Sequence, residues 1–196
     1  MKKQLFIQIF IKLSLAFLII QFVSHSVYGY TKIDKVKENG KKNIRILERI
    51  YKKYPISIKQ KSEFEKVKTV WEKNLKDLNL INKKNRREAE KNLIEVYKEI
   101  KTTLEKTCEI LAVYGNDLII NFQKRLDEEK PNSIDKEKYV NQFNVSRREF
   151  MRAEKAFRSE YYYYSAHLYD RGIQILVKIH ERLNWTIPPA YRNLIN

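Results

Sequence analysis

The chain has 196 residues, which is enough for one domain with a sizeable core and too few for two ordinary domains. Its 40 lysines and arginines outnumber its 24 aspartates and glutamates, which gives a net charge of +16 at pH 7. A single cysteine excludes an intramolecular disulfide framework, and the scarcity of glycine and proline, four of each, favours an all-helical fold.

Residues 1–29 have the pattern of a signal peptide. Lys2 and Lys3 precede an apolar run from Leu13 to Val23, and the Val-Tyr-Gly sequence at 27–29 offers a cleavage point. Cleavage there would leave residues 30–196 as a single all-helical domain. The predicted location is therefore the periplasm or the extracellular space.

An uncleaved membrane anchor is the alternative for the same segment. Residues 5–23 approach the length of a bilayer span, but Gln8, Lys12 and Gln21 interrupt them, and a lysine near the middle of a membrane is costly. In this alternative the domain is anchored and faces away from the cytoplasm, and its membrane contact is made by the N-terminal segment.

Apolar residues recur at three- and four-residue spacing along most of residues 30–196, which predicts helices with one buried face. The first predicted helix ends before Pro55, and Gly40 weakens its upstream half. A second helix begins at Ser57 or Ser62, and residues 79–85 form the turn after it.

The third predicted helix is the longest and runs from Ala89 to Tyr114, where Gly115 and Asn116 interrupt it. Residues 118–126 then form either a new helix or a continuation past a kink. Residues 131–133 (Pro-Asn-Ser) predict a break. Ser146 and Glu149 have the spacing of a capping box, which predicts a helix start there, and a last helix covers residues 166–183.

The basic residues are spread along the chain and interleaved with acidic ones, as on solvated helix surfaces. We therefore expect no nucleic-acid partner. Binding of an anionic lipid or polymer through charge alone remains the alternative function.

No pattern of catalytic residues is found in the sequence. Cys108 lies within an apolar stripe, which predicts a buried thiol, with an intermolecular disulfide as the alternative. His167 and His180, together with one cysteine, do not supply the ligands of an ordinary zinc site. We expect no enzymatic activity, no cofactor and no metal.

Residues 153–173 read AEKAFRSEYYYYSAHLYDRGI and resemble the tetratricopeptide helical hairpin, which has small residues where its two helices cross. Glu160 and Tyr161 stand where this family usually has a Gly-Asp turn, and the typical tryptophan of the first helix is absent. The positions that match the family pattern are the small residues Ala153, Ser165 and Gly172 and the inter-helix aromatic Tyr169.

The resemblance covers one unit of a family whose arrays generally need three or more, and no second copy follows at the family period of about 34 residues. It implies a two-helix hairpin and a protein-binding role. In composition the chain is also similar to small, lysine-rich exported helical proteins of spirochaetes, including periplasmic proteins of the flagellar apparatus.

Tyr161 to Tyr164 form a run of four tyrosines. Consecutive residues of a helix point about 100° apart, so the four rings cannot all face one core. We expect at least one ring to meet solvent or a partner, since tyrosine is common in binding hot spots. In the alternative interpretation two rings pack inward, one fills the hairpin turn and one is simply exposed.

The sequence thus predicts an exported, non-enzymatic, all-α bundle, or a set of tetratricopeptide-like hairpins, that binds another protein of acidic or helical character. Such a protein would serve as a structural or assembly component, for example of an envelope or flagellar assembly. Its predicted partner-binding residues are aromatic anchors and basic residues that steer an acidic partner. These residues are Phe157, Tyr161, Tyr162, Tyr163, Tyr164, Tyr169, Trp185, Arg148, Arg152 and Arg158.

Overall fold

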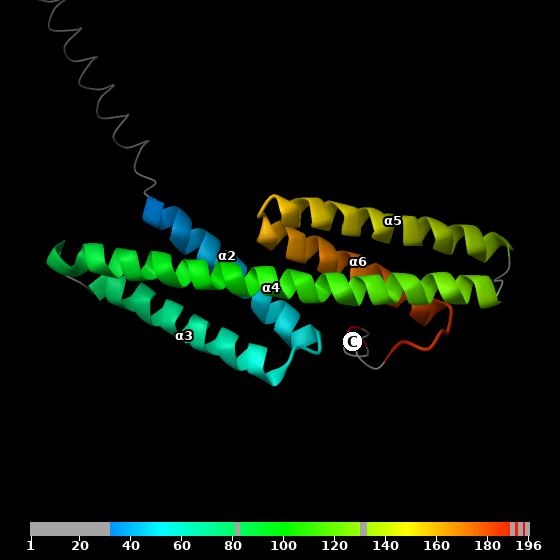
Figure 1. Cartoon of the computed structure of the whole chain (residues 1–196), viewed down its shortest axis with the longest axis horizontal. Helices are drawn as coiled ribbons and strands as arrows, with labels where there is room; N and C mark the ends of the chain where they lie inside the picture. Colours follow the sequence, from blue (N-terminus) through cyan, green and yellow to red (C-terminus); the bar gives the residue numbers. More distant parts are fainter. Residues whose placement is uncertain (1–31, 81–82, 130–132, 189–190, 192–193, 195–196) are drawn as a thin grey trace, which may run out of the picture. The chain divides into compact units, whose positions relative to one another are not determined.

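The computed structural model describes residues 32–80, 83–129, 133–188, 191 and 194. The predicted signal peptide lies outside these residues. Within them the chain forms five helices and no strand, which confirms the all-α class (Figure 1). The helices are α2 (Lys32–Lys53), α3 (Ile58–Leu80), α4 (Lys83–Glu129), α5 (Ser133–Arg158) and α6 (Tyr162–Arg182).

The chain divides between Glu38 and Asn39 into two compact units, and α2 crosses this boundary. In the described part of the first unit, Lys37 approaches Asp34 one helical turn away, at 3.9 Å. Residues 39–196 form the second unit, which contains the rest of α2 and all of α3–α6. None of the described helices is both long enough and apolar enough to span a bilayer.

The connection between α2 and α3 is set by local chemistry. Pro55 disfavours helical geometry in the residue before it, and α2 accordingly ends at Lys53. The Ser57 hydroxyl oxygen then accepts a hydrogen bond from the backbone N–H of Gln60 at 3.3 Å, and the Ser57 hydroxyl donates to the Gln60 side chain at 2.8 Å. Ser57 therefore caps α3, whose first helical residue is Ile58, which supports the predicted start at Ser57 over the one at Ser62.

The longest helix, α4, continues without interruption through Gly115 and Asn116, so of the two predicted alternatives residues 118–126 continue the same helix and do not begin a new one. A single glycine costs a helix only about 1 kcal/mol, which packing can offset. The reason for glycine here is space: a Cβ atom at position 115 would lie 2.2 Å from the ring of Phe150. The predicted turn at 79–85 is also mostly helical, because α3 reaches Leu80 and α4 starts at Lys83.

The predicted capping box at Ser146 and Glu149 is wrong, because both residues lie in the middle of α5. Both are buried and serve packing between helices instead. The Ser146 hydroxyl donates to the backbone oxygen of Gly172 in α6 at 2.9 Å, and Glu149 forms ion pairs with Arg152 at 3.3 Å and Arg171 at 3.9 Å.

Within the 39–196 unit, each of the other helices contacts the longest helix, α4. Helix α3 packs against α4, while α6 packs against both α4 and α5 (Figure 1). From Asn39 onward, α2 contacts three of these helices: Tyr51 meets Phe64 of α3 and Thr107 of α4, and Arg49 meets Asp170 of α6. The core of the 39–196 unit is filled by fully buried side chains that include Leu47, Ile50, Tyr54, Phe64, Trp71, Leu93, Ile100, Leu104, Leu111, Leu118, Phe122 and Ile173.

Candidate functional site

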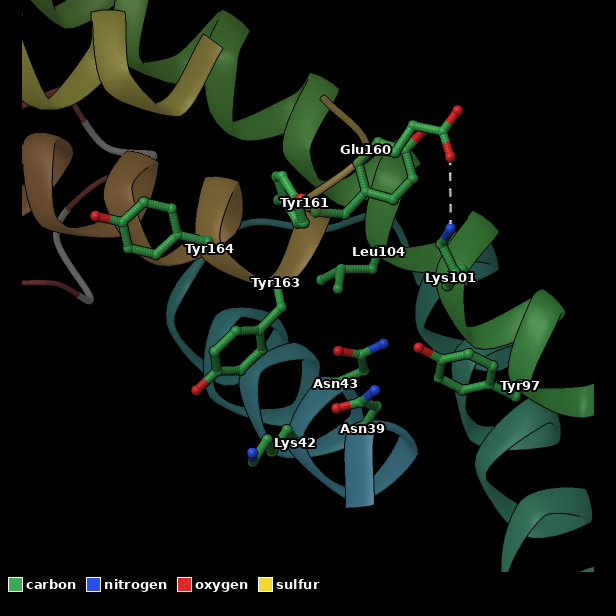
Figure 2. A pocket seen from close by; sticks show the side chains of 11 residues that line it. Asn39, Lys42, Asn43, Tyr97, Lys101, Leu104, Glu160, Tyr161, Tyr163 and Tyr164 are labelled. Atoms are coloured by element: carbon green, nitrogen blue, oxygen red, sulfur yellow. Dashed lines mark ion pairs between the residues drawn. The ribbon is translucent and has the colours of Figure 1, made fainter. Parts of the chain in front are cut away.

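The run of tyrosines lies at one wall of a pocket of about 220 Å³ within the 39–196 unit (Figure 2). Three elements that are far apart in the sequence line it: α2, the middle of α4, and the turn from α5 into α6. We call it the tyrosine pocket. Its lining residues are Asn39, Lys42, Asn43, Tyr97, Lys101, Leu104, Glu160, Tyr161, Tyr162, Tyr163 and Tyr164.

The tight turn at residues 159–161 positions the tyrosines. The backbone N–H of Glu160 donates to Phe157 O and that of Tyr161 to Ala156 O, each at 2.9 Å, which closes the end of α5. Glu160 has φ 59°, a left-handed conformation that favours glycine. The chain reverses there at once, so that Tyr162 is already the first residue of α6.

Three of the four tyrosines are exposed. The exposed fraction is 70% for Tyr161, 44% for Tyr163 and 43% for Tyr164. Large apolar side chains of this exposure, gathered at one pocket, are characteristic of interaction sites more than of scattered surface residues. The Tyr164 hydroxyl accepts a hydrogen bond from Arg152 Nη2 at 2.7 Å, which holds one ring and brings a guanidinium group beside it.

Tyr162 alone of the four turns inward. Its ring packs against Phe157 at 5.4 Å between centroids, and its hydroxyl donates to Glu105 Oε1 at 2.9 Å. Burial and the Glu105 carboxylate raise the pKa of Tyr162 to about 12. The ammonium of Lys101 lies 5.6 Å from the centre of the same ring, within cation–π range. Tyr162 therefore supports the wall of the pocket.

The opposite wall is polar. Tyr97, Asn39 and Asn43 face one another there (Figure 2). Burial raises the pKa of Tyr97, and the side-chain amides of the two asparagines offset part of this rise. At the rim, Lys101 Nζ approaches Glu160 Oε2 at 3.7 Å. The pocket thus combines aromatic faces with amide and hydroxyl groups and with the positive charges of Lys42 and Lys101.

The predicted basic residues are distributed over different surfaces. Arg152 joins the pocket through Tyr164, whereas Arg158 forms an ion pair with Glu154 on the exposed side of α5. Arg148 lines a separate shallow hollow on α5 together with Met151. The structure therefore assigns only Arg152 of these three to the tyrosine pocket.

Two predicted aromatic anchors are buried, and this corrects the prediction. Tyr169 packs against Phe150 at 6.0 Å, and Trp185 packs against Phe122 at 5.4 Å and His180 at 5.5 Å. Tyr169 enters the core from α6, and Trp185 enters it from the segment after α6, where its backbone N–H donates to His180 O at 2.9 Å. Neither offers an exposed ring to a partner.

Seven of the lining residues were not predicted from the sequence as site residues: Asn39, Lys42, Asn43, Tyr97, Lys101, Leu104 and Glu160. The sequence spacing could have indicated the two asparagines. Asn43 stands four residues before the core residue Leu47, and Asn39 stands four before Asn43, so all three lie on one face of the helix. A buried asparagine on an apolar stripe requires hydrogen-bond partners, and here it has one in Tyr97.

The residues that line the pocket include no cysteine or histidine. Cys108 is fully buried, its thiol donates to the backbone oxygen of Tyr162 at 3.4 Å, and burial raises its pKa to about 12, so the structure has the buried thiol that the apolar stripe predicts. His167 contacts Arg49 at 3.2 Å, and His180 lies in the core. The described residues contain no cluster of three or more histidine, cysteine or acidic side chains that could hold a metal.

Comparison with models of protein families, with curated proteins and with solved structures finds no match to this chain.

Proposed function

We propose that this protein is an exported, non-enzymatic assembly component that binds an acidic partner protein at the tyrosine pocket. The proposed export rests on the signal-like pattern of residues 1–29. The proposed binding rests on one observation: three exposed tyrosines that the fold brings to the edge of a pocket also lined by amides and lysines.

The chemistry of these residues supports protein binding. A tyrosine ring gives a large rigid contact area with a polar tip, and only two torsion angles have to be fixed on binding. Asparagine amides and lysine ammonium groups beside the rings supply directed hydrogen bonds. Binding hot spots are typically built from such aromatic and polar neighbours at the centre of a contact surface.

The charge distribution favours an acidic partner. The chain carries a net charge of +16, and Lys42, Lys101 and Arg152 lie at or beside the pocket, where Glu160 pairs with Lys101 and Glu149 pairs with Arg152. Opposite charge on the partner would raise the association rate and select against basic competitors.

The first experiment crosslinks the protein to its neighbours in the native cell and identifies the products by mass spectrometry. Tyr161→Ala combined with Tyr163→Ala removes two exposed rings without disturbing the Tyr162 contacts, so we expect at least a tenfold loss of the crosslinked partner, in line with hot-spot losses of about 2 kcal/mol or more. The control is Met151→Ala, an equally exposed side chain (68%) that lines other hollows.

The same spectra report the N-terminus of the protein. A mature start near Tyr30 would support cleavage after the signal, and an intact N-terminus in a membrane fraction would support the anchored alternative. Unchanged crosslinks in the double variant, with its helical circular dichroism preserved, would contradict the proposed site.

Salt separates this proposal from binding of anionic polymers or lipids by charge alone. Attachment driven by counterion release weakens steeply between roughly 50 and 200 mM salt, whereas contacts centred on aromatic rings weaken only modestly.

A further inference from the structure

We infer that the acidic part of the partner lies along the outer side of α5, against Arg147, Arg148 and Lys155, while the tyrosine pocket binds an uncharged part of the same partner. We call these three cations the α5 face. The inference rests on the function proposed above and divides the contact between two neighbouring surfaces. Three observations lead to it: the pairing of the cations at the pocket, the unpaired charge on α5, and the link between the two surfaces.

The cations at the tyrosine pocket already have partners. Lys101 lies 3.7 Å from the Glu160 carboxylate, and Arg152 pairs with Glu149 at 3.3 Å. Lys42 is not without a partner either. An acidic side chain that entered the pocket would have to displace such partners, so the rings and amides of the pocket suit an uncharged part of a protein.

The α5 face carries unpaired positive charge. Its three side chains are exposed, and none of them forms an ion pair with another of the described residues. The guanidinium group of Arg147 lies 5.9 Å from the centre of the Phe143 ring, a contact that orients the cation and leaves its charge intact. The charge of the α5 face is therefore available to an acidic partner.

The acidic residues of the same stretch do not neutralise the α5 face. Between residues 138 and 158 the only acidic residues are Glu149 and Glu154. Glu149 is buried and pairs with Arg152 and Arg171, and Glu154 pairs with Arg158. Positive charge is thus concentrated on this side of α5, although basic and acidic residues alternate along much of the chain.

The geometry of α5 gathers the three cations on one side. Arg148 and Lys155 are seven residues apart, close to two helical turns, and the helix rises about 12 Å from Arg147 to Lys155. Ser146 and Ala153 lie on the opposite side, where they contact α6. The α5 face therefore points away from the bundle, and the planar donors of its arginines suit the carboxylates of an acidic segment.

Arg152 links the α5 face to the tyrosine pocket. It stands one helical turn after Arg148, and its Nη2 donates to the hydroxyl of Tyr164, which lines the pocket, at 2.7 Å. A partner seated on the exposed tyrosines would have to extend only about 6 Å further along α5 to reach Arg148. This continuity favours one protein that contacts both surfaces over a separate membrane contact of α5.

Fluorescence anisotropy of the full chain with a labelled Glu-Ser repeat peptide tests the α5 face. At about 50 mM salt the screening of exposed charges is weak, and we expect the peptide to bind. The triple variant Arg147→Gln, Arg148→Gln and Lys155→Gln should weaken this binding at least about tenfold, and added salt should lower the affinity of the native chain more than that of the variant.

The matched control is Lys59→Gln, Lys61→Gln and Lys73→Gln on α3. These lysines are also exposed, and their replacement removes the same amount of charge. We expect the control to weaken the peptide by less than about twofold, because its charges lie outside the α5 face. Met151→Ala, which leaves the charge of α5 unchanged, should also retain the affinity. Circular dichroism verifies that every variant stays helical.

Equal weakening by the two triple variants would show that the charge acts diffusely and would overturn the inference, as would no binding of the peptide to the native chain. Loss of the peptide in Tyr161→Ala with Tyr163→Ala would place the acidic contact in the pocket and would overturn it as well.

Crosslinking in the native cell separates the inference from the proposed function. We expect the α5 variant and the tyrosine double variant to lose the same crosslinked partner. Loss in the tyrosine variant alone would overturn the inference and leave the proposed function standing, whereas loss in the α5 variant alone would contradict the proposed site. Binding to phosphatidylglycerol vesicles that only the α5 variant loses, with its crosslinks intact, would assign the α5 face to a membrane and overturn the inference.

Discussion

At the scale of single residues, two glycines of this protein are sites where a ring packs directly against a helix backbone. A Cβ atom at Gly40 would lie 2.2 Å from the Trp71 ring, and one at Gly115 would lie 2.2 Å from the Phe150 ring. The two rings differ in their freedom: Trp71 is fully buried, whereas Phe150 is half-buried and borders a hollow. Gly40 in particular was expected to weaken α2, and instead it allows α2 to approach α3.

This difference gives a prediction for two alanine variants. Gly40→Ala should lower the free energy of unfolding by about 1–3 kcal/mol, because the enclosed Trp71 ring cannot move aside without disturbing the core. Gly115→Ala should cost less, because the Phe150 ring can turn toward the hollow while alanine improves helix propensity. Urea unfolding followed by circular dichroism measures both.

A double-mutant cycle separates the overlap with the Trp71 ring from the change in helix propensity that alanine brings. Combining Gly40→Ala with Trp71→Phe should cost less than the sum of the two single changes, because the smaller ring relieves the overlap. A Gly40→Ala variant as stable as the native chain would show that Trp71 is free to shift.

At the scale of helices, α2 and α6 are joined by one buried carboxylate. Asp170 accepts hydrogen bonds from the Tyr54 hydroxyl and from Gln174 Nε2, each at 2.8 Å, and Arg49 approaches it at 3.1 Å. Burial and the Asp170 charge raise the pKa of Tyr54, so this phenol stays protonated and remains a donor. Gln174 lies one turn along α6 from Asp170, so the contacts from the α2 side are those of Arg49 and of Tyr54, the residue after the end of α2.

Replacing this carboxylate should be costly. Asp170→Ala leaves the Tyr54 hydroxyl buried without its acceptor and Arg49 without its counter-ion, and we expect a loss of about 3–5 kcal/mol in the free energy of unfolding. The matched control is Glu90→Ala, which removes an exposed ion pair with Arg86 (3.1 Å) and should cost less than about 1 kcal/mol. Equal effects in urea unfolding would refute the structural role assigned to Asp170.

At the scale of the whole molecule, His180 makes stability depend on pH. Its Nδ1 lies 2.9 Å from the backbone oxygen of Leu176, and its Nε2 has no partner between the rings of Phe122 and Trp185. Burial lowers the pKa of His180 below the ordinary 6.5, and the positive charge of Arg125 lowers it further. The core therefore holds the neutral imidazole.

The sign of the pH effect follows from this. The unfolded chain takes up a proton near pH 6.5 and the folded chain only at lower pH, so stability is complete above about pH 6.5 and falls as the pH drops toward the folded-state pKa. The slope contributed by His180 is at most about 1.4 kcal/mol per pH unit. Urea midpoints at about pH 7.5 and 5.5 should differ more for the native chain than for His180→Phe. An identical difference in both proteins would contradict this origin.

The helices could be predicted from the sequence because each helix buries one face, and the three- and four-residue spacing of apolar residues indicates that face. Their boundaries were harder to predict, since Gly115 and Ser146 look like helix ends but serve contacts with Phe150 and Gly172 that spacing does not reveal. The tyrosine run was visible in the sequence. The opposite wall of its pocket was not, because Asn39 and Tyr97 meet only when α2 packs beside α4.

The tyrosine pocket is composite, since α2, α4 and the start of α6 each contribute part of its lining. No excised hairpin of this chain could reproduce it, and a fragment that ends before Glu160 or begins after Lys101 would lack a complete wall. An occupant would bridge helices that are distant in sequence and would bind only when they are assembled. Its binding would therefore protect the whole fold against heat, by about 1.4 kcal/mol for each tenfold excess over the dissociation constant.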